Sequence, residues 1–154
     1  NALAVQDLLE HKEVATRVMT AIRMEEVAEP YIRRKALRHM EKGRVVLFAG
    51  GTGNPYFSTD TAAVLRAIEM GSQVVIKATK VKGIYSADPT EDPSAEFIPS
   101  ITFQEVVQRE LAVMDAAAVS LCKENGLPII VLNLENQGAV SAAVRGDRVG
   151  TLVS

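Results

Sequence analysis

A short segment between residues 49 and 62 combines glycines, hydroxyl side chains and a carboxylate. It reads A-G-G-T-G-N-P-Y-F-S-T-D-T-A and follows the β-branched run 44–48, which predicts a buried parallel strand. It leads into residues 60–70, whose apolar positions recur at helical spacing. In open α/β sheets, ligands bind at such strand-to-helix connections. Because glycines allow close backbone approach and helix N-termini favour anions, the segment predicts an anion or nucleotide site.

Residue types alone leave a second interpretation open for this segment. It can be an ordinary strand–turn–helix connection in which Ser58, Thr59 or Asp60 caps the helix, with Asp60 at the N-cap. The segment matches neither the P-loop pattern, since the Gly-Lys-Ser/Thr end is missing, nor the dinucleotide pattern G-x-G-x-x-G. The residues therefore do not identify the ligand further.

A second chemistry-bearing stretch covers residues 78–99 and reads A-T-K-V-K-G-I-Y-S-A-D-P-T-E-D-P-S-A-E-F-I-P. Its density of Gly, Pro, Asp and Ser predicts a long excursion with turns, and such long loops are usually functional or disordered. Lysines can neutralise phosphate oxygens, a tyrosine can stack on a base, and an aspartate can hold Mg²⁺. Because this stretch follows the predicted strand 73–78, we expect a ligand-binding role here too.

The elements that must position these two stretches alternate along the chain. Helical periodicity or caps predict helices over 1–12, 29–42, 60–70, 102–109, 112–125 and 139–144, and β-rich runs predict strands over 14–22, 44–48, 73–78, 127–132 and 149–154. Pro30 suits an early helical position, and Thr102 with Glu105 forms a capping-box pattern. Asp115 is expected to cap its helix. The alternation indicates an α/β fold with a parallel sheet and crossovers.

Four cations crowd the predicted helix 29–42: Arg33, Arg34, Lys35 and Arg38. Charge runs on helices are usually solvated faces, and this is the interpretation we favour. The alternative is a contact with an acidic partner subunit or with a phosphate.

Composition bounds the class of protein. The 154 residues carry a net charge of −2, which gives no basic footprint for nucleic acid, and no apolar run is long enough to span a membrane. The single cysteine, Cys122, fits a reducing compartment and a helical core position, and we expect a cytoplasmic protein. His11 and His39 lack metal-ligand spacing, and we expect both on the surface.

Seven ordered motifs resemble one family. The most specific are G-T-G-N-P-Y-F-S-T-D at 51–60 and K-A-T-K-V-K-G-I-Y-S-A-D-P at 77–89. The others are N-A-L-A at 1–4, R-V-M-T-A-I at 17–22, A-E-P-Y-I-R-R-K-A at 28–36, V-M-D-A-A-A at 113–118 and G-T-L-V-S at 150–154. In these segments the chain resembles the bacterial uridylate (UMP) kinases of the amino-acid-kinase superfamily.

This resemblance implies a three-layer αβα sandwich with a mainly parallel sheet, as in carbamate-kinase-like folds. It implies transfer of the γ-phosphoryl group of ATP to UMP, with Mg²⁺, in pyrimidine nucleotide biosynthesis. It assigns the UMP side to eight consecutive residues: Thr52, Gly53, Asn54, Pro55, Tyr56, Phe57, Ser58 and Thr59. It assigns the ATP side to Thr79, Tyr85 and Asp88.

Three residues are candidates for the catalytic step in this interpretation. Asp60 and Asp88 would orient lysines or Mg²⁺, and Lys77 would neutralise phosphates. Lys80, which is outside this set of three, would also neutralise phosphates. Lys77 and Lys80 can equally be surface lysines.

The chain also departs from the family's pattern. Family members begin with a K-L-S-G-E strand and a G-G-G-N loop, and neither motif is present here. We therefore expect residues 1–154 to form a single domain that corresponds to the C-terminal two-thirds of the family's domain, without the N-terminal strands, and to be inactive alone. The family implies homohexamers with GTP and UTP as possible effectors. Two alternatives stay open: another phosphotransferase of this fold, and a non-catalytic nucleotide-binding or assembly fragment.

Overall fold

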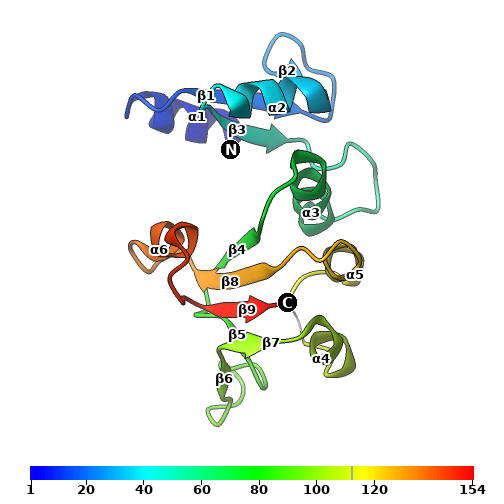
Figure 1. Cartoon of the computed structure of the whole chain (residues 1–154), viewed down its shortest axis with the longest axis vertical. Helices are drawn as coiled ribbons and strands as arrows, with labels where there is room; N and C mark the ends of the chain where they lie inside the picture. Colours follow the sequence, from blue (N-terminus) through cyan, green and yellow to red (C-terminus); the bar gives the residue numbers. More distant parts are fainter. Residues whose placement is uncertain (112) are drawn as a thin grey trace. The chain divides into compact units, whose positions relative to one another are not determined.

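The computed structural model describes residues 1–111 and 113–154, which form two compact units, residues 1–70 and 71–154 (Figure 1). The elements of the first unit are α1 (Ala2–Glu10), β1 (Thr16–Thr20), β2 (Glu29–Pro30), α2 (Arg33–Glu41), β3 (Val45–Ala49) and α3 (Thr59–Met70). Those of the second are β4 (Val75–Thr79), β5 (Ile84–Tyr85), β6 (Phe97–Ile98), β7 (Ser100–Ile101), α4 (Phe103–Gln108), α5 (Ala116–Glu124), β8 (Ile129–Asn133), α6 (Ala139–Arg145) and β9 (Thr151–Val153).

The first unit is built on a parallel three-stranded sheet with the strand order β2-β1-β3. The register joins Thr16 to Val45 and Thr20 to Ala49, so β1 and β3 end at the same edge of the sheet. Its core holds Met19, Ala36 and Met70, with Phe48 packed against them. The glycine-rich segment therefore begins at the sheet edge where β1 and β3 end, as expected for an open α/β sheet.

The helix predicted over residues 29–42 begins later than expected. Glu29 and Pro30 form the edge strand β2, and α2 begins only at Arg33. Parallel pairing with β1 explains the difference, since the amide of Tyr31 donates to the carbonyl of Thr20 over 2.9 Å. A proline is tolerated on an edge strand, and the residue before it favours extended backbone. Pairing therefore outweighs the helix-starting signal of the proline.

The histidine expectation is confirmed for one residue and wrong for the other. The side chain of His11 is exposed, whereas that of His39 is only 16% exposed. His39 Nε2 lies 3.0 Å from a carboxylate oxygen of Glu29, and its Nδ1 lies 2.9 Å from Arg44 Nη1. His39 is thus half-buried because β2, which the sequence did not predict, places Glu29 beside α2.

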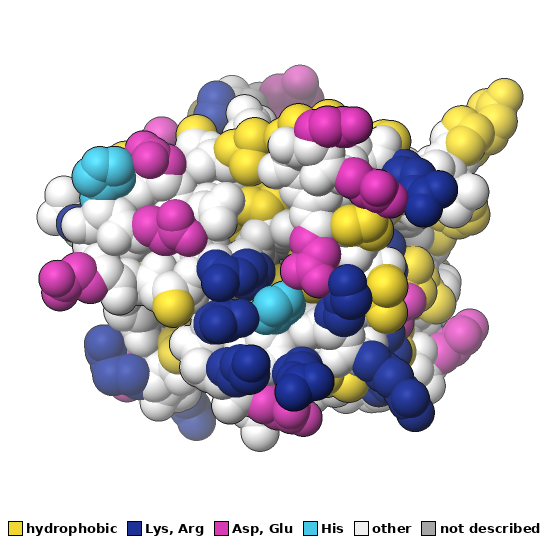
Figure 2. Space-filling view, turned by 90° about the horizontal axis from the view of Figure 1, so that it is seen from above, with side chains coloured by type: hydrophobic (Ala, Val, Ile, Leu, Met, Phe, Trp, Pro, Cys, Tyr) yellow, Lys and Arg dark blue, Asp and Glu magenta, His cyan; other side chains and the backbone are white. Residues whose placement is uncertain are grey.

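The basic run of α2 is exposed to solvent, which agrees with the favoured interpretation, and two of its cations also have polar partners. Lys35 pairs with Glu29 over 3.1 Å, and Arg33 Nε donates to the backbone carbonyl of Glu69 over 2.6 Å. All four cations, Arg33, Arg34, Lys35 and Arg38, are exposed. Figure 2 shows Lys and Arg side chains gathered on one face of the molecule. A partner or phosphate contact at this face stays a prediction.

The second unit has a four-stranded sheet of order β4-β8-β9-β7 and a separate two-stranded sheet, β5-β6. β4 runs parallel to β8, and β7 runs parallel to β9, while β9 is antiparallel to β8. The helix α6 packs on this sheet, where Leu132 contacts Ala139 and Ala143 in one buried cluster. The predicted α/β fold with parallel sheets is therefore confirmed.

The helix termini of the second unit agree with their expected caps. Thr102 and Glu105 form the predicted capping box, and the Asp115 carboxylate accepts a bond from the amide of Ala118 over 3.1 Å. The helix predicted from 112 begins instead at Ala116, since Asp115 is its cap; Ala112 itself lies outside the described residues. Cys122 is buried as expected, and burial raises the pKa of its thiol to about 11.

The excursion 78–99 is more regular than its composition predicts. Two short strands pair in it as an antiparallel hairpin, with Ile84 opposite Ile98 and Tyr85 opposite Phe97. Among the described residues no helix combines the length and the apolar character that crossing a membrane requires.

Candidate functional site

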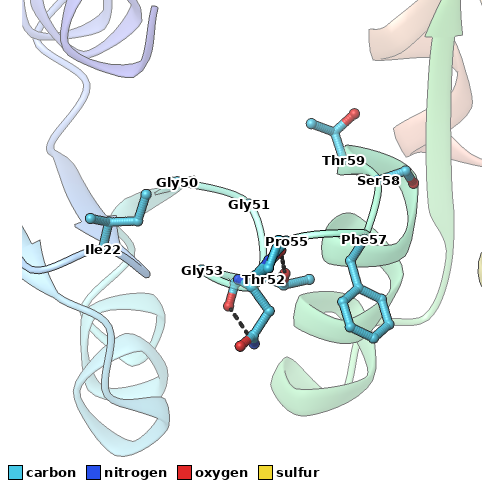
Figure 3. A pocket seen from close by; sticks show the side chains of 10 residues that line it. Ile22, Gly50, Gly51, Thr52, Gly53, Pro55, Phe57, Ser58 and Thr59 are labelled. Atoms are coloured by element: carbon cyan, nitrogen blue, oxygen red, sulfur yellow. Dashed lines mark hydrogen bonds between the residues drawn. The ribbon is translucent and has the colours of Figure 1, made fainter.

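A cavity of about 280 Å³ lies along the glycine-rich segment in the first unit (Figure 3). Its lining comes from the end of β3, the connection that follows it, and the start of α3: Gly50, Gly51, Thr52, Gly53, Asn54, Pro55, Phe57, Ser58 and Thr59, with Ile22 from the end of β1. The structure therefore gathers seven of the eight residues assigned to the UMP side into one hollow.

Backbone conformation shapes this cavity. Gly50 and Gly53 both have φ +76°, a region that side chains disfavour. A Cβ atom on Gly50 would lie 3.1 Å from the Thr20 hydroxyl, and one on Gly53 would lie 3.0 Å from the carbonyl oxygen of Ala21. The two glycines therefore let the segment pass close to the end of β1.

Side-chain hydrogen bonds fix the two ends of the connection. The Thr52 hydroxyl accepts from the amide of Asn54 over 3.1 Å, and the Ser58 hydroxyl accepts from the amide of Thr61, also over 3.1 Å. Ser58 thus caps α3, so the capping interpretation holds for it. Asp60 is not the N-cap but lies in the first turn of α3, where a carboxylate suits the helix dipole.

Tyr56 differs from the other residues of the predicted UMP set. It has φ +68° and a fully exposed side chain, and it does not line the cavity. Its neighbour Phe57 does line the cavity and is 57% exposed. A role for Tyr56 toward UMP stays a prediction that the cavity does not support.

Sequence reasoning missed Ile22 as a lining residue, and it noted Gly50 and Gly51 without assigning them to the site. Parallel pairing of β1 with β3 brings Ile22 beside Gly50, as Figure 3 shows. The signal was available, since strands of a parallel sheet present their carboxyl ends at one edge.

The second unit holds the residues assigned to the ATP side, beginning with Thr79 at the end of β4. Its hydroxyl donates to the carbonyl of Val81 over 2.9 Å and lies 3.3 Å from the carbonyl of Leu132. Asn133 in turn donates its side-chain amide to the carbonyl of Lys80 over 3.1 Å. The turn after β4 is therefore tied to the end of β8.

Tyr85 lies in the hairpin that follows. Its ring contacts the ring of Phe97 edge to face, with the centroids 5.6 Å apart. The ammonium group of Lys82 lies 4.5 Å from the centre of the same Phe97 ring. An aromatic pair with a cation beside it suits a nucleotide, whose base stacks and whose phosphates are negative.

Asp88 follows the hairpin strand β5 and closes a tight turn. Its Oδ1 accepts from the amide of Thr90 over 2.8 Å and from the Thr90 hydroxyl over 2.6 Å. These donors hold the pKa of Asp88 below its ordinary value, so this exposed carboxylate is charged at neutral pH. Asp92 repeats the same turn with Ser94.

The three catalytic candidates come from both units. Asp60 belongs to α3 in the first unit, whereas Lys77 and Asp88 belong to the second. Lys77 is half-buried in β4, where it pairs opposite Val131. Their assembly into one catalytic centre stays a prediction.

The fold and the cavity are typical of α/β proteins that bind a ligand at a strand-to-helix connection, and comparisons with known proteins identify the family. The family model described as "Amino acid kinase family" matches residues 1–133, so the chain belongs to the amino acid kinase family. The chain is 54% identical over 153 residues to the chloroplastic uridylate kinase PUMPKIN of Arabidopsis thaliana.

Two solved structures are also similar to this chain. The UMP kinase of Bacillus anthracis matches the whole chain with a TM-score of 0.97 and 38% identity, and that of Ureaplasma parvum matches it with a TM-score of 0.95 and 35% identity. The chain covers 64% and 66% of these two structures. The alignment with the plant protein includes 99% of this chain and 45% of the plant protein. It thus spans less than two thirds of these relatives.

Proposed function

We propose that this chain is part of a uridylate kinase, which transfers the γ-phosphoryl group of ATP to UMP and releases UDP and ADP. The observation that carries the proposal is the coincidence of two findings. The chain is 54% identical to a uridylate kinase, and seven of the eight residues predicted to hold UMP line one cavity in a strand-to-helix connection.

The acceptor side follows from the cavity chemistry. Gly50, Gly51 and Gly53 carry no side chains, so an anion can approach the backbone of this connection closely, while the amide of Gly53 itself donates to the carbonyl of Gly50 over 3.1 Å. The hydroxyl of Thr59 adds a donor at the start of α3, whose dipole also favours a phosphate group. Such a cavity would hold the UMP phosphate in position to attack the γ-phosphorus atom of ATP.

The donor side uses the second unit, where we propose that Thr79, Tyr85 and Asp88 contact ATP. The bond between the γ-phosphorus atom and its bridging oxygen breaks as a UMP phosphate oxygen forms the new bond. Catalysis of this step consists mainly of positioning and charge stabilisation. Lys77 and Lys80 would supply positive charge to the transferred group, and Asp60 would orient a lysine.

The residues present fit Mg²⁺ as the accompanying ion. Within residues 1–111 and 113–154 no group of three or more His, Cys, Asp and Glu side chains could hold a metal. Nucleotide-bound Mg²⁺ needs only one or two carboxylates besides phosphate oxygens, and Asp88 offers a charged, exposed one. When bound, Mg²⁺ neutralises charge on the phosphates. We propose Asp88 as its ligand, with Asp60 as the second candidate.

Further properties are proposed from the resemblance. We propose that both units belong to one amino-acid-kinase domain, and that the chain alone lacks catalytic groups because it spans only part of its relatives. Assembly into homohexamers, regulation by GTP or UTP, and a cytoplasmic location are proposed in the same way. The plant relative is described as chloroplastic, so the compartment needs its own experiment.

The acceptor assignment is tested by calorimetric titration of the chain with UMP, CMP and AMP. We expect UMP to bind at least about tenfold more tightly than the others, and Thr59→Ala to weaken UMP binding by about tenfold. The control Ser120→Ala, which removes an exposed hydroxyl of α5, should leave the affinity unchanged. Equal binding of the three nucleotides would overturn the uridylate assignment.

The donor assignment is tested with a matched pair of variants. Asp88→Asn and Asp92→Asn remove one charge from the same kind of turn, but only Asp88 is assigned to ATP and Mg²⁺. We expect Asp88→Asn to weaken Mg·ATP binding and Asp92→Asn to leave it unchanged. Equal effects of the two variants would refute a specific role for Asp88.

A coupled ADP-release assay with UMP distinguishes a catalytic uridylate kinase from a non-catalytic nucleotide-binding fragment. Turnover selective for UMP would show that the chain is catalytic by itself. Retained UMP binding without turnover would support the interpretation as a non-catalytic nucleotide-binding fragment.

A further inference from the structure

One buried hydroxyl group joins the hairpin of the second unit to the central strands of its sheet. Thr151, the first residue of β9, is completely buried. Its Oγ1 accepts a hydrogen bond from the amide of Ile84 over 2.8 Å and donates one to the carbonyl of Ile98 over 2.5 Å. Because Ile84 and Ile98 are paired across the hairpin, a single side chain holds both of its strands.

The hairpin needs this attachment because it is very short. Each of its strands has two residues, and a two-stranded hairpin of this size is marginal by itself. Thr151 belongs to a strand with neighbours on both sides, β8 and β7. The hydroxyl therefore transmits the rigidity of the four-stranded sheet to the hairpin.

The hairpin can approach Thr151 closely because residue 83 is a glycine. A Cβ atom on Gly83 would lie 2.5 Å from the Thr151 hydroxyl and 2.8 Å from the Phe97 ring. The backbone of Gly83 has an ordinary φ, so lack of space rather than conformation requires glycine there. Any larger residue would push the hairpin away from the hydroxyl.

Two residues assigned to ATP depend on the place of this hairpin. Tyr85 lies in β5 directly after Ile84, and the ladder continues to Ser86, whose amide donates to the carbonyl of Glu96 over 2.9 Å. Asp88 follows two residues beyond this last cross-strand bond. A shift of the hairpin would therefore move both the tyrosine and the carboxylate.

We propose that Thr151 is a positioning residue for the ATP side: its buried hydroxyl fixes the hairpin 84–98 and, through it, Tyr85 and Asp88. This inference rests on the proposed function for the ATP assignment, but the attachment of the hairpin can be tested without it.

The test compares two substitutions of nearly equal size. Thr151→Val keeps the shape but leaves the Ile84 amide and the Ile98 carbonyl without their partner, whereas Thr151→Ser keeps the hydroxyl. Hydrogen exchange is measured at the amides of Ser86 and Glu96, with the amides of β8 as the internal reference. We expect Thr151→Val to accelerate exchange in the hairpin by about tenfold or more, the scale for losing a buried hydrogen-bond partner.

Nucleotide binding is measured on the same proteins by titration with Mg·ATP and with UMP. We expect Thr151→Val to weaken ATP binding by about tenfold while UMP binding stays within about twofold of the starting protein. Thr151→Ser should restore both the exchange rates and the ATP affinity. A residue that only stabilises the second unit would instead accelerate exchange throughout β8 as well.

A second variant keeps the inference falsifiable if Thr151→Val does not fold. Gly83→Ala displaces the hairpin from its own side with Thr151 intact, so it should reproduce the same pattern. Unchanged hairpin exchange in both variants would overturn the inference, and so would acceleration that is equal in the hairpin and in β8. If the starting protein binds no ATP, the proposed function fails, while the exchange ratio still decides whether Thr151 holds the hairpin.

Discussion

The two candidate nucleotide loops are held in place by different means. In the first unit, positive backbone angles at Gly50, Gly51 and Gly53 shape the cavity, and side chains such as Tyr56 and Phe57 stay exposed. In the second unit, a buried hydroxyl and an aromatic pair hold the hairpin. The comparison teaches that both loops are sensitive to added side-chain atoms at their glycines, and that the second loop also depends on a buried polar group.

The largest effect is expected where a glycine also supports the second loop. Gly150 directly precedes Thr151, has φ +64°, and would place a Cβ atom 2.0 Å from the carbonyl oxygen of Val131. Gly150→Ala must therefore force β9 away from β8. We expect the free energy of unfolding of the second unit to fall by about 3 kcal/mol, measured by urea denaturation.

The control for this variant is Gly146→Ala. Gly146 has φ +86° but open space around its would-be Cβ atom, so only backbone strain of about 1 kcal/mol is expected. Equal losses of unfolding free energy in Gly150→Ala and Gly146→Ala would contradict this prediction. They would show that the close contact between residue 150 and the carbonyl oxygen of Val131 contributes nothing.

The next prediction sharpens the same distinction inside the first loop. Gly53 and Gly51 both have positive φ, at +76° and +61°, but only Gly53 approaches other atoms, 3.0 Å from the carbonyl oxygen of Ala21. We expect Gly53→Ala to cost about 2 kcal/mol of unfolding free energy in the first unit and Gly51→Ala about 1 kcal/mol. Thermal denaturation of the two variants side by side measures the difference, and a larger loss for Gly51→Ala would contradict the assignment of the contact.

The C-terminal end of α3 has a polar anchor at Tyr31, which gives an expected effect of alkaline pH on stability. Tyr31 donates its hydroxyl to Glu69, whose carboxylate pairs with Arg66 over 2.6 Å, and the guanidinium group of Arg66 lies 3.8 Å from the centre of the Tyr31 ring. Burial, and then the bond to Glu69, raise the pKa of Tyr31 to about 12.

A raised pKa favours the protonated form in the folded state. The stabilisation is therefore fully present below the ordinary tyrosine pKa of about 10 and is lost as the pH rises from there towards 12. We expect Tyr31→Phe to remove this part of the alkaline loss, as measured by unfolding at a series of pH values. Tyr56→Phe, which removes an exposed hydroxyl, is the matched control, and an unchanged alkaline profile in Tyr31→Phe would refute the anchor.

The smallest effect is expected at the capping box of α4. The hydroxyl and the amide of Thr102 both donate to the Glu105 carboxylate, and these two bonds lower the pKa of Glu105. The amide of Glu105 donates in turn to the Thr102 hydroxyl. A lowered pKa means that stabilisation is present above the ordinary glutamate value and disappears as the pH falls. We expect Thr102→Ala to cost about 1 kcal/mol at neutral pH and less in acid, with Thr102→Ser close to the starting protein. Equal losses at both pH values would show that Glu105 plays no part in the cap.

Local signals were sufficient for much of the fold. The capping box at Thr102, the cap at Asp115 and the glycine segment before α3 all involve groups within a few residues of one another, and periodicity identified the longer helices and strands. The strand at Glu29 escaped prediction because its partner is β1 rather than a near neighbour in sequence. Ile22 was missed for the same reason, as parallel pairing brings it to the cavity.

The sequence by itself determined the α/β class, the two loops that carry chemistry, and the resemblance to uridylate kinases, because periodicity, caps and motifs are written in neighbouring residues. Only the tertiary structure decided which of these residues share a cavity and what holds the hairpin. The partners of the Thr151 hydroxyl lie 67 and 53 residues away, and no local pattern announces such a bond. Contacts over such separations form only when whole strands pair, since pairing places their side chains together.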